Sequence, residues 1–210
     1  MRDKERPEIF TLADGIAALK TGELVVYPTE TLYGIGADPL SAAALQRLFA
    51  VKHREPGNPV GLIASDATTA FFFAREIPHA ARRLADYFWP GPLTIVVPAR
   101  EGTPPELVGD DGGVGVRVSP HPVARALAAG LGRPITATSA NPAGMPTVAT
   151  LAEARATFGA KVKVYLEGGL LAGAAPSTVV AIDATGWRLI RPGAISEREL
   201  AAALAEGALK

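Results

Sequence analysis

Apolar residues recur along this chain in two patterns, one typical of helices and one typical of buried strands. In residues 41–51 they return every three to four positions, which predicts an amphipathic helix. Residues 9–20, 78–89, 120–131, 151–158 and 196–209 show similar helical signals. For the last of these, Ser196 followed by Glu199 has the spacing of a capping box.

Short runs rich in Val, Ile and Thr, bounded by Gly and Pro, predict the strands. They lie at residues 22–28, 60–64, 93–97, 115–118, 134–138, 162–166, 177–182 and 187–190. Because helices and strands do not alternate strictly, the order favours an α/β fold with a twisted mixed sheet flanked by helices, rather than a regular βαβ barrel. Residues 101–113 are acidic, rich in Gly and Pro and poor in apolar residues, so a mobile loop is expected there.

The length and composition set limits on the class of protein. A chain of 210 residues with 48% hydrophobic and 20% charged residues is expected to form one globular domain, residues 1–210, and no internal linker divides it. We expect a cytoplasmic protein without membrane contact, because no segment is apolar for long enough to cross a bilayer and the polar start lacks a secretory signal. The absence of cysteine excludes disulfides and thiolate catalysis, and three scattered histidines do not predict a protein-held metal.

The charges balance, with 21 Lys and Arg against 21 Asp and Glu. A broad electrostatic footprint for nucleic acid is therefore not expected. A local basic patch stays open, because five cations are candidates for a ring around the mouth of a site. They are Arg75, Arg82, Arg83, Lys161 and Lys163.

Lys52 and Arg54 stand where the predicted helix 41–51 gives way to a loop containing Glu55, Gly57 and Asn58. Cations at this position are often no more than partners of the helix dipole. However, the loop leads directly into a predicted buried strand, and ligands commonly bind where loops meet the rim of a sheet. Lys52 and Arg54 are therefore candidate anion-binding residues.

Two polar loops follow predicted strands. Residues 28–36 include Thr31 and two glycines, and they are either a strand-to-helix turn or the polar floor of a pocket. Ser139 and Asn141 follow the strand at 134–138 and either stabilise a turn or donate hydrogen bonds to a phosphate chain held by the two cations.

Arg117 lies within an otherwise apolar strand and needs an anionic partner, which is either an internal Asp or Glu or the carboxylate of a substrate. The sequence shows no arrangement of nucleophile, base and orienting group. Chemistry would then depend on positioning and charge neutralisation, as in nucleotidyl transfer. A Mg²⁺ ion carried by the nucleotide would leave little trace in the sequence.

Six motifs, in order between about residues 10 and 195, resemble the threonylcarbamoyl-AMP synthases of the YrdC-like family. They are Pro28 to Ala37, Lys52-x-Arg54 with Asn58-Pro59, Arg117 with His121-Pro122, Thr138-Ser139-x-Asn141 with Gly144, Pro176 to Val180, and Arg191-Pro192-Gly193. The resemblance implies a YrdC-like fold with a large, positively lined cavity in a single domain, and no second domain.

The resemblance also implies a reaction. L-threonine, bicarbonate and ATP give threonylcarbamoyl-adenylate and pyrophosphate, with Mg²⁺ accompanying ATP. The product is used to modify adenosine 37 of tRNA, so a downstream transfer complex and a weak contact with tRNA are the implied partners.

The family's pattern assigns roles to eleven residues of this chain. Lys52, Arg54, Ser139 and Asn141 match the catalytic signature at the nucleotide. The implied ATP contacts are Arg54, Asn58, Ser139, Asn141, Thr147 and Arg191. The implied threonine contacts are Thr31, Arg117, Ala137 (through its backbone) and Ser177.

The chain departs from the family's pattern at three positions. Ile63 stands where longer members have a histidine, Glu55 where many have proline, and Ala181 where aspartate is usual, with Asp183 two residues later. In longer members a linker closes over the site; here residues 101–113 or the N-terminal segment are hypothesised to do so.

Two alternative functions remain at this point. One is a paralogue that carries out another carbamoyl or adenylate transfer. The other is a non-catalytic module that binds double-stranded RNA, which the zero net charge disfavours because such binding depends on many cationic contacts to phosphate.

Overall fold

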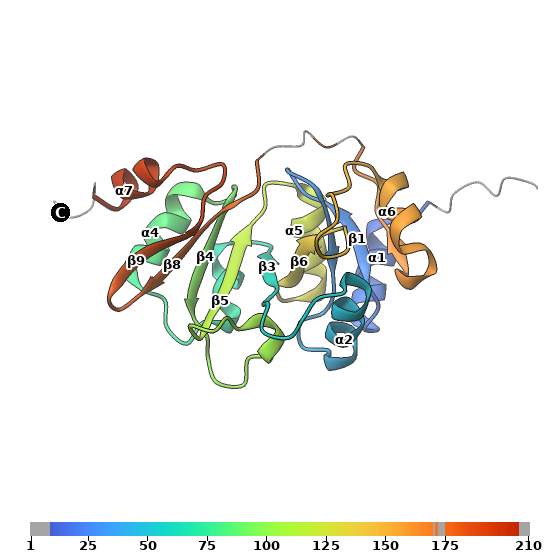
Figure 1. Cartoon of the computed structure of the whole chain (residues 1–210), viewed down its shortest axis with the longest axis horizontal. Helices are drawn as coiled ribbons and strands as arrows, with labels where there is room; N and C mark the ends of the chain where they lie inside the picture. Colours follow the sequence, from blue (N-terminus) through green and yellow to red (C-terminus); the bar gives the residue numbers. More distant parts are fainter. Residues whose placement is uncertain (1–8, 170, 172–174, 206–210) are drawn as a thin grey trace, which may run out of the picture.

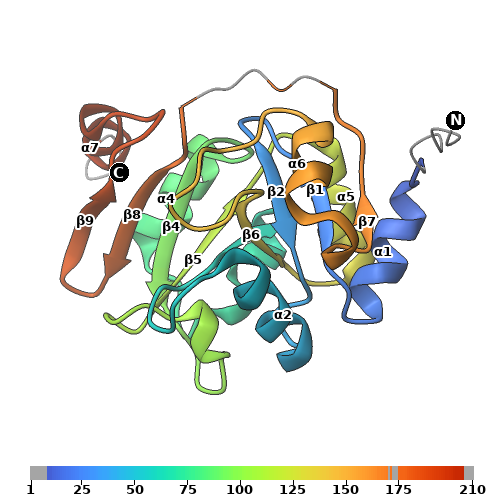
Figure 2. The same ribbon diagram turned by 45° about the vertical axis from the view of Figure 1, so that its right-hand side comes forward.

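The computed structural model describes residues 9–169, 171 and 175–205. In this part of the chain, nine strands form one mixed sheet in the order β7-β1-β2-β6-β3-β5-β4-β8-β9 (Figures 1 and 2). The strands are β1 Val25–Pro28, β2 Tyr33–Gly36, β3 Gly61–Ala64, β4 Leu93–Pro98, β5 Gly113–Val118, β6 Ile135–Ser139, β7 Val164–Tyr165, β8 Thr178–Asp183 and β9 Gly186–Arg191. Parallel and antiparallel pairs alternate irregularly, so the predicted mixed sheet is confirmed.

The helices cover the sheet unevenly. They are α1 Leu12–Lys20, α2 Ala42–Lys52, α3 Ala67–Ala70, α4 His79–Phe88, α5 Pro122–Leu131, α6 Leu151–Phe158 and α7 Glu197–Ala205. Short 3₁₀ turns lie at Phe71–Phe73, Pro105–Leu107 and Gly159–Lys161. The helix predicted at residues 151–158 is confirmed to the residue, and the bonds between Ser196 and Glu199 form the capping box predicted for α7.

At the β1 end, both faces of the sheet are covered. Val26 packs in a cluster with α2 and α6, while its neighbours Val25 and Tyr27 pack in another cluster with α1 and α5. Side chains of successive strand residues point to opposite faces, so a strand buried on both faces must be apolar throughout, as β1 is.

The segment at residues 28–36 is a β-hairpin and not a strand-to-helix turn, so that alternative is wrong. The Thr29 amide donates to Leu32 O across the turn at 3.1 Å, and β2 returns antiparallel to β1. Gly34 and Gly36 lie in β2, and a Cβ at Gly36 would lie 2.8 Å from Cε1 of Tyr27. The glycines therefore make room for a buried tyrosine ring, a reason that the sequence pattern did not reveal.

The loop at residues 101–113 is anchored more firmly than its composition predicted. Leu107 is 1% exposed and belongs to the hydrophobic core, and the Val60 amide donates to Glu106 O at 2.9 Å. One leucine is thus enough to anchor a polar stretch of this length to the core, and the mobility expected of the loop stays a prediction.

Candidate active site

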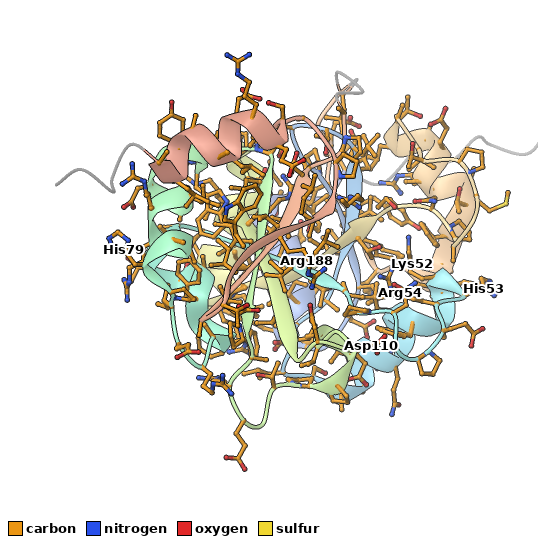
Figure 3. All side chains as sticks on the ribbon, turned by 60° about the vertical axis from the view of Figure 1, so that its left-hand side comes forward. Lys52, His53, Arg54, His79, Asp110 and Arg188 are labelled. Carbon is orange, nitrogen blue, oxygen red and sulfur yellow. The ribbon has the colours of Figure 1, made fainter. Side chains whose placement is uncertain are left out.

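A cavity of about 720 Å³ opens on one face of the sheet, opposite the helices that cover its other face. Figure 3 shows Arg188 near the middle of the molecule and Asp110, Arg54 and Lys52 to its right, whereas His53 and His79 lie at opposite edges. Contributions to the cavity wall come from loops after β1, α2 and β6 and from β3, β4, β5, β8 and β9. Ligand pockets of proteins have volumes of this size.

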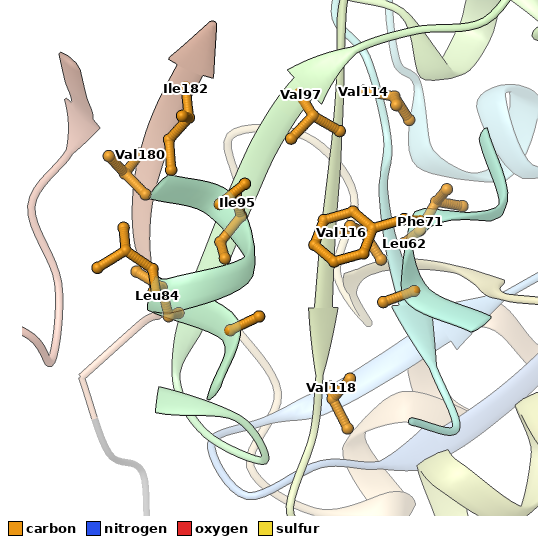
Figure 4. Close-up of a cluster of buried hydrophobic side chains, with 14 of the residues drawn as sticks. Leu62, Phe71, Leu84, Ile95, Val97, Val114, Val116, Val118, Val180 and Ile182 are labelled. Atoms are coloured by element: carbon orange, nitrogen blue, oxygen red, sulfur yellow. The ribbon is translucent and has the colours of Figure 1, made fainter. Parts of the chain in front are cut away.

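Strand alternation separates the cavity from the core. In β4, Leu93, Ile95 and Val97 belong to the core cluster under α4, part of which Figure 4 shows, while Thr94 and Val96 line the cavity. β5 behaves in the same way, and its cavity-facing positions include Gly113 and Gly115. These glycines leave the floor open where larger side chains would fill it.

Lys52 is the last residue of α2 and is 2% exposed. Its Nζ donates to the backbone oxygens of Ser139 and Asn141, which joins α2 to the loop after β6. Burial, with a smaller contribution from Arg54, lowers the pKa of Lys52 to about 8 despite these two acceptors. Lys52 does not line the cavity, so in this structure its direct role is to hold the loop that does.

Arg54 lines the cavity and is fixed by the loop that follows it. Its Nε donates to Asn58 O at 2.7 Å, and its Nη2 donates to Asn58 Oδ1 at 2.9 Å and Pro59 O at 2.6 Å. Burial lowers the pKa of Arg54, whose guanidinium nevertheless stays charged. Asn58 therefore serves the cavity through Arg54, since it does not line the cavity itself.

Ser139 at the end of β6 and Thr147 in the loop that follows both line the cavity, and Asn141 supports this loop from behind. Asn141 Nδ2 donates to Met145 O at 2.6 Å and to Pro142 O at 3.1 Å. Its Oδ1 is buried without a hydrogen-bond partner among the described residues. Asn141 thus stabilises its own turn, which was one of the two predicted roles. Ser139 lines the cavity, where it can contact a ligand.

Arg117 meets an internal carboxylate, which was one of its two predicted partners. Its Nη1 donates to Oε1 of Glu30, and Ser119 Oγ donates to the other carboxylate oxygen, Oε2. The Arg117 and Glu30 side chains are 11% and 19% exposed. Arg117 also lines the cavity, so the ion pair does not remove it from the candidate site.

Ser177 and Arg191 form a connected corner of the cavity. Arg191 Nη2 donates to Ser177 O at 2.8 Å, and the hydroxyls of Ser177 and Thr94 lie 3.0 Å apart. Burial, and then the positive charge of Arg117, lower the pKa of Arg191. Two positively charged side chains that repel each other across a cavity stabilise an anion bound between them.

Of the eleven predicted site residues, eight line the cavity and three lie behind its wall. The eight are Thr31, Arg54, Arg117, Ala137, Ser139, Thr147, Ser177 and Arg191, and the three are Lys52, Asn58 and Asn141. The structure thus brings together residues from all six motifs, with Ala137 and Thr147 from beside the fourth. The roles that the resemblance assigned to them stay predictions.

Three charged residues of the cavity were missed by the sequence reasoning. Arg188 in β9 bonds Asp111 Oδ2 at 3.1 Å, and Asp110 is the neighbouring carboxylate of the wall. The alternation of Trp187 and Leu189, which pack on the core, with Arg188 between them was the available signal. Asp110 and Asp111 carried no signal beyond the acidity of their loop.

The remaining sequence features fall outside the cavity or at its floor. Glu55 and Asp183 are exposed, Ala181 is buried, and Ile63 is fully buried at the cavity floor. None of the five cations proposed as a basic ring lines the cavity, and Arg83 donates to Ala203 O in α7 instead. The N-terminal segment hypothesised as a lid, residues 1–8, lies outside the described residues.

Among the described residues, no cluster of three or more His, Asp or Glu side chains has the arrangement of a metal site. No helix in this part of the chain is both long and apolar enough to cross a membrane.

Comparison with known proteins places this geometry in context. The pattern of the Sua5/YciO/YrdC family, described as "Telomere recombination", matches residues 17–193. A threonylcarbamoyl-AMP synthase of Pyrococcus abyssi is 36% identical over 205 residues, which are 97% of this chain and 60% of that protein. One of Chromohalobacter salexigens is 41% identical over 168 residues, which are 80% of this chain and 90% of that protein.

A solved structure of Pyrococcus abyssi Sua5 complexed with L-threonine has a TM-score of 0.85 and 34% identity to this chain. The match covers 95% of this chain and 59% of that one, so the chain spans about three fifths of this longer relative. The chain thus has a mixed sheet with a cavity of ligand size on one face, and Arg54, Arg117, Arg188 and Arg191 lie in the cavity wall. The chain belongs to the Sua5/YciO/YrdC family.

Proposed function

We propose that the chain is a nucleotidyltransferase that makes L-threonylcarbamoyl-adenylate from L-threonine, bicarbonate and ATP. The observation that carries this proposal is the meeting of two predicted residue sets in one cavity. Arg54, Ser139 and Thr147 belong to the nucleotide set, and Arg117 and Ser177 to the threonine set. The named synthases at 36% and 41% identity support the same assignment.

The proposed reaction has two steps. The threonine amine first combines with bicarbonate, which gives a carbamate and water. A carbamate oxygen then attacks the α-phosphorus of ATP, and the bond to the β-phosphate breaks, which releases pyrophosphate. Negative charge builds up on the phosphates in this second step, so positive groups fixed beforehand stabilise its transition state.

The residues of the cavity suit these requirements. Arg117 is placed to hold the threonine carboxylate, and Arg54 and Arg191 to neutralise the phosphates. Lys52 acts through the Ser139 loop that it holds. Threonine selectivity over serine depends on an apolar contact to one methyl group, which discriminates by only about 1–3 kcal/mol, so some use of serine is expected.

Mg²⁺ would enter with ATP, since such ions keep most of their ligands from phosphate and water and need few from protein. Asp110 suits this ion because its carboxylate lines the cavity and makes no bond to the described residues, whereas Asp111 is bonded to Arg188. The ion would supply further charge neutralisation on the phosphates.

The proposed partners follow from the product. The adenylate would pass to a downstream complex that transfers threonylcarbamoyl to tRNA. We therefore expect the protein in the cytoplasm, with a weak contact with tRNA. These partners come from the likeness to the named synthases.

The test is pyrophosphate release by the purified protein with ATP, Mg²⁺, bicarbonate and threonine. We expect release that requires both threonine and bicarbonate. Arg54→Ala should reduce it at least a hundredfold, while Arg117→Ala should mainly raise the threonine requirement, with thermal unfolding showing that both variants are folded. Release that is absent with every amino acid tried would overturn the proposal. Release with another acceptor in place of threonine would favour the paralogue alternative.

A further inference from the structure

Glu30 is a half-buried carboxylate to which no motif assigned a role, and it lies between Thr29 and Thr31, which both line the cavity. It lies in the turn between β1 and β2, 87 residues from Arg117 in sequence, and pairs with that arginine across the sheet. Because one partner lies in this turn and the other in β5, the pair is set by the fold and does not follow from local sequence.

The two partners use their hydrogen-bonding capacity very differently. Both oxygens of Glu30 are engaged, one by Arg117 and the other by Ser119, which is fully buried. Ser119 Oγ is itself fixed, since it accepts from the His121 amide at 3.1 Å. In contrast, a guanidinium has five N–H donors, and within the described residues only the one at Nη1 makes a hydrogen bond.

A ligand that replaced Glu30 on Arg117 would have to displace a carboxylate whose two oxygens are both hydrogen-bonded. Displacing it from Arg117 would break a largely buried ion pair and leave the carboxylate with only the Ser119 hydroxyl, which is unfavourable. A ligand carboxylate that binds the unused N–H groups of Arg117 needs no such displacement. The geometry therefore favours a ligand carboxylate that binds Arg117 while Glu30 stays bonded to it.

We propose that Glu30 is a positioning residue that orients the Arg117 guanidinium so that its unused N–H groups face the cavity and bind the substrate's carboxylate. The identity of that carboxylate as threonine's rests on the proposed function. The orienting role itself does not, because it concerns contacts within the chain.

The variant Glu30→Gln tests the role because it keeps the shape of the side chain and removes its charge. We expect the KM for threonine to rise about tenfold, with kcat and the KM for ATP changed less than twofold. A merely structural role would lower the melting temperature without this selective effect on threonine.

A second, partly buried ion pair provides the matched control. Asp38 accepts from Arg133 at 2.8 Å and 2.6 Å, and neither residue lines the cavity. Asp38→Asn is expected to lower the melting temperature and leave the KM for threonine unchanged. Should Glu30→Gln fail to fold, Ser119→Ala removes one anchor of the carboxylate and is expected to raise the KM for threonine severalfold.

The orientation of Arg117 can also be measured without any substrate. In arginine side-chain NMR spectra, restricted rotation should give Arg117 two separate Nη resonances in the wild type, assigned by their loss in Arg117→Lys. They should merge in Glu30→Gln. Unchanged Nη resonances in Glu30→Gln, or a lower KM for threonine in this variant, would overturn the inference. A wild type without pyrophosphate release but with the expected NMR change would instead overturn only the proposed function.

Discussion

Lys52 shows how one residue can belong to a site without facing its ligand. The sequence placed it correctly at the end of a helix, but the partners of its Nζ, the backbone oxygens of Ser139 and Asn141, come from a loop 87 and 89 residues away. No local pattern predicts such a contact, because it depends on how β6 and α2 pack. Of the two cations that the sequence suggested as a phosphate clamp, Arg54 therefore faces the cavity, while Lys52 supports the cavity wall from behind.

The lowered pKa of Lys52 predicts how stability depends on pH. The pKa is about 8 in the folded protein against 10.5 for a free lysine, so between these values the unfolded chain binds more protons. Stability contributed by this group therefore rises with pH across that window and is constant below it. Methionine does not titrate, so we expect the unfolding free energy of the wild type minus that of Lys52→Met to increase from about pH 8 to 10.5. Urea denaturation measures both free energies. A difference that stays constant would show that the ammonium is not destabilised by burial.

At the scale of elements, patterns that lie within one segment were predictable and those that depend on pairing were not. The helix at residues 151–158 has its own capping box, Thr150 with Glu153, and its bounds were predicted correctly. β2 was missed as a strand because it is short and contains Gly34 and Gly36, which weaken a strand signal. Only the packing of Tyr27 against these glycines explains them.

The loop before β5 yields a prediction about an element. Leu107 is the buried anchor of this loop, so Leu107→Ala should destabilise the protein by about 2–4 kcal/mol. It should also loosen the loop that carries Asp110 and Asp111 to the cavity. We expect faster hydrogen exchange at the Val60 amide, which donates to Glu106 O. Exposed Leu40 offers a control, because Leu40→Ala should change neither quantity. Unchanged exchange at Val60 in Leu107→Ala would show that the loop is held by its other contacts.

At the scale of the whole molecule, positive charge is concentrated in the cavity wall although the net charge of the chain is zero. The chain is neutral, with 21 charges of each sign, yet in its described part the cavity gathers Arg54, Arg117, Arg188 and Arg191 against two aspartates. Net charge could predict the absence of a broad basic surface, but not this local excess, because the four arginines come from two strands and one loop that are far apart in the sequence.

This distribution of charge separates the proposed synthase from an RNA-binding module. A module that binds double-stranded RNA contacts phosphates over about 16 base pairs, and its affinity falls steeply with salt because each contact releases counterions. A cavity of about 720 Å³ offers its arginines to a small ligand and not to a duplex, and the five cations expected around its mouth do not line it.

We therefore expect a labelled RNA duplex to bind only weakly, with a dissociation constant above about 10⁻⁶ M at physiological salt, as for non-specific contacts. Fluorescence anisotropy measures this, and competition by ATP separates cavity binding from surface binding. Tight binding of the duplex with a steep salt dependence that ATP does not relieve would favour the RNA-binding alternative, since it would require a cationic surface elsewhere on the molecule.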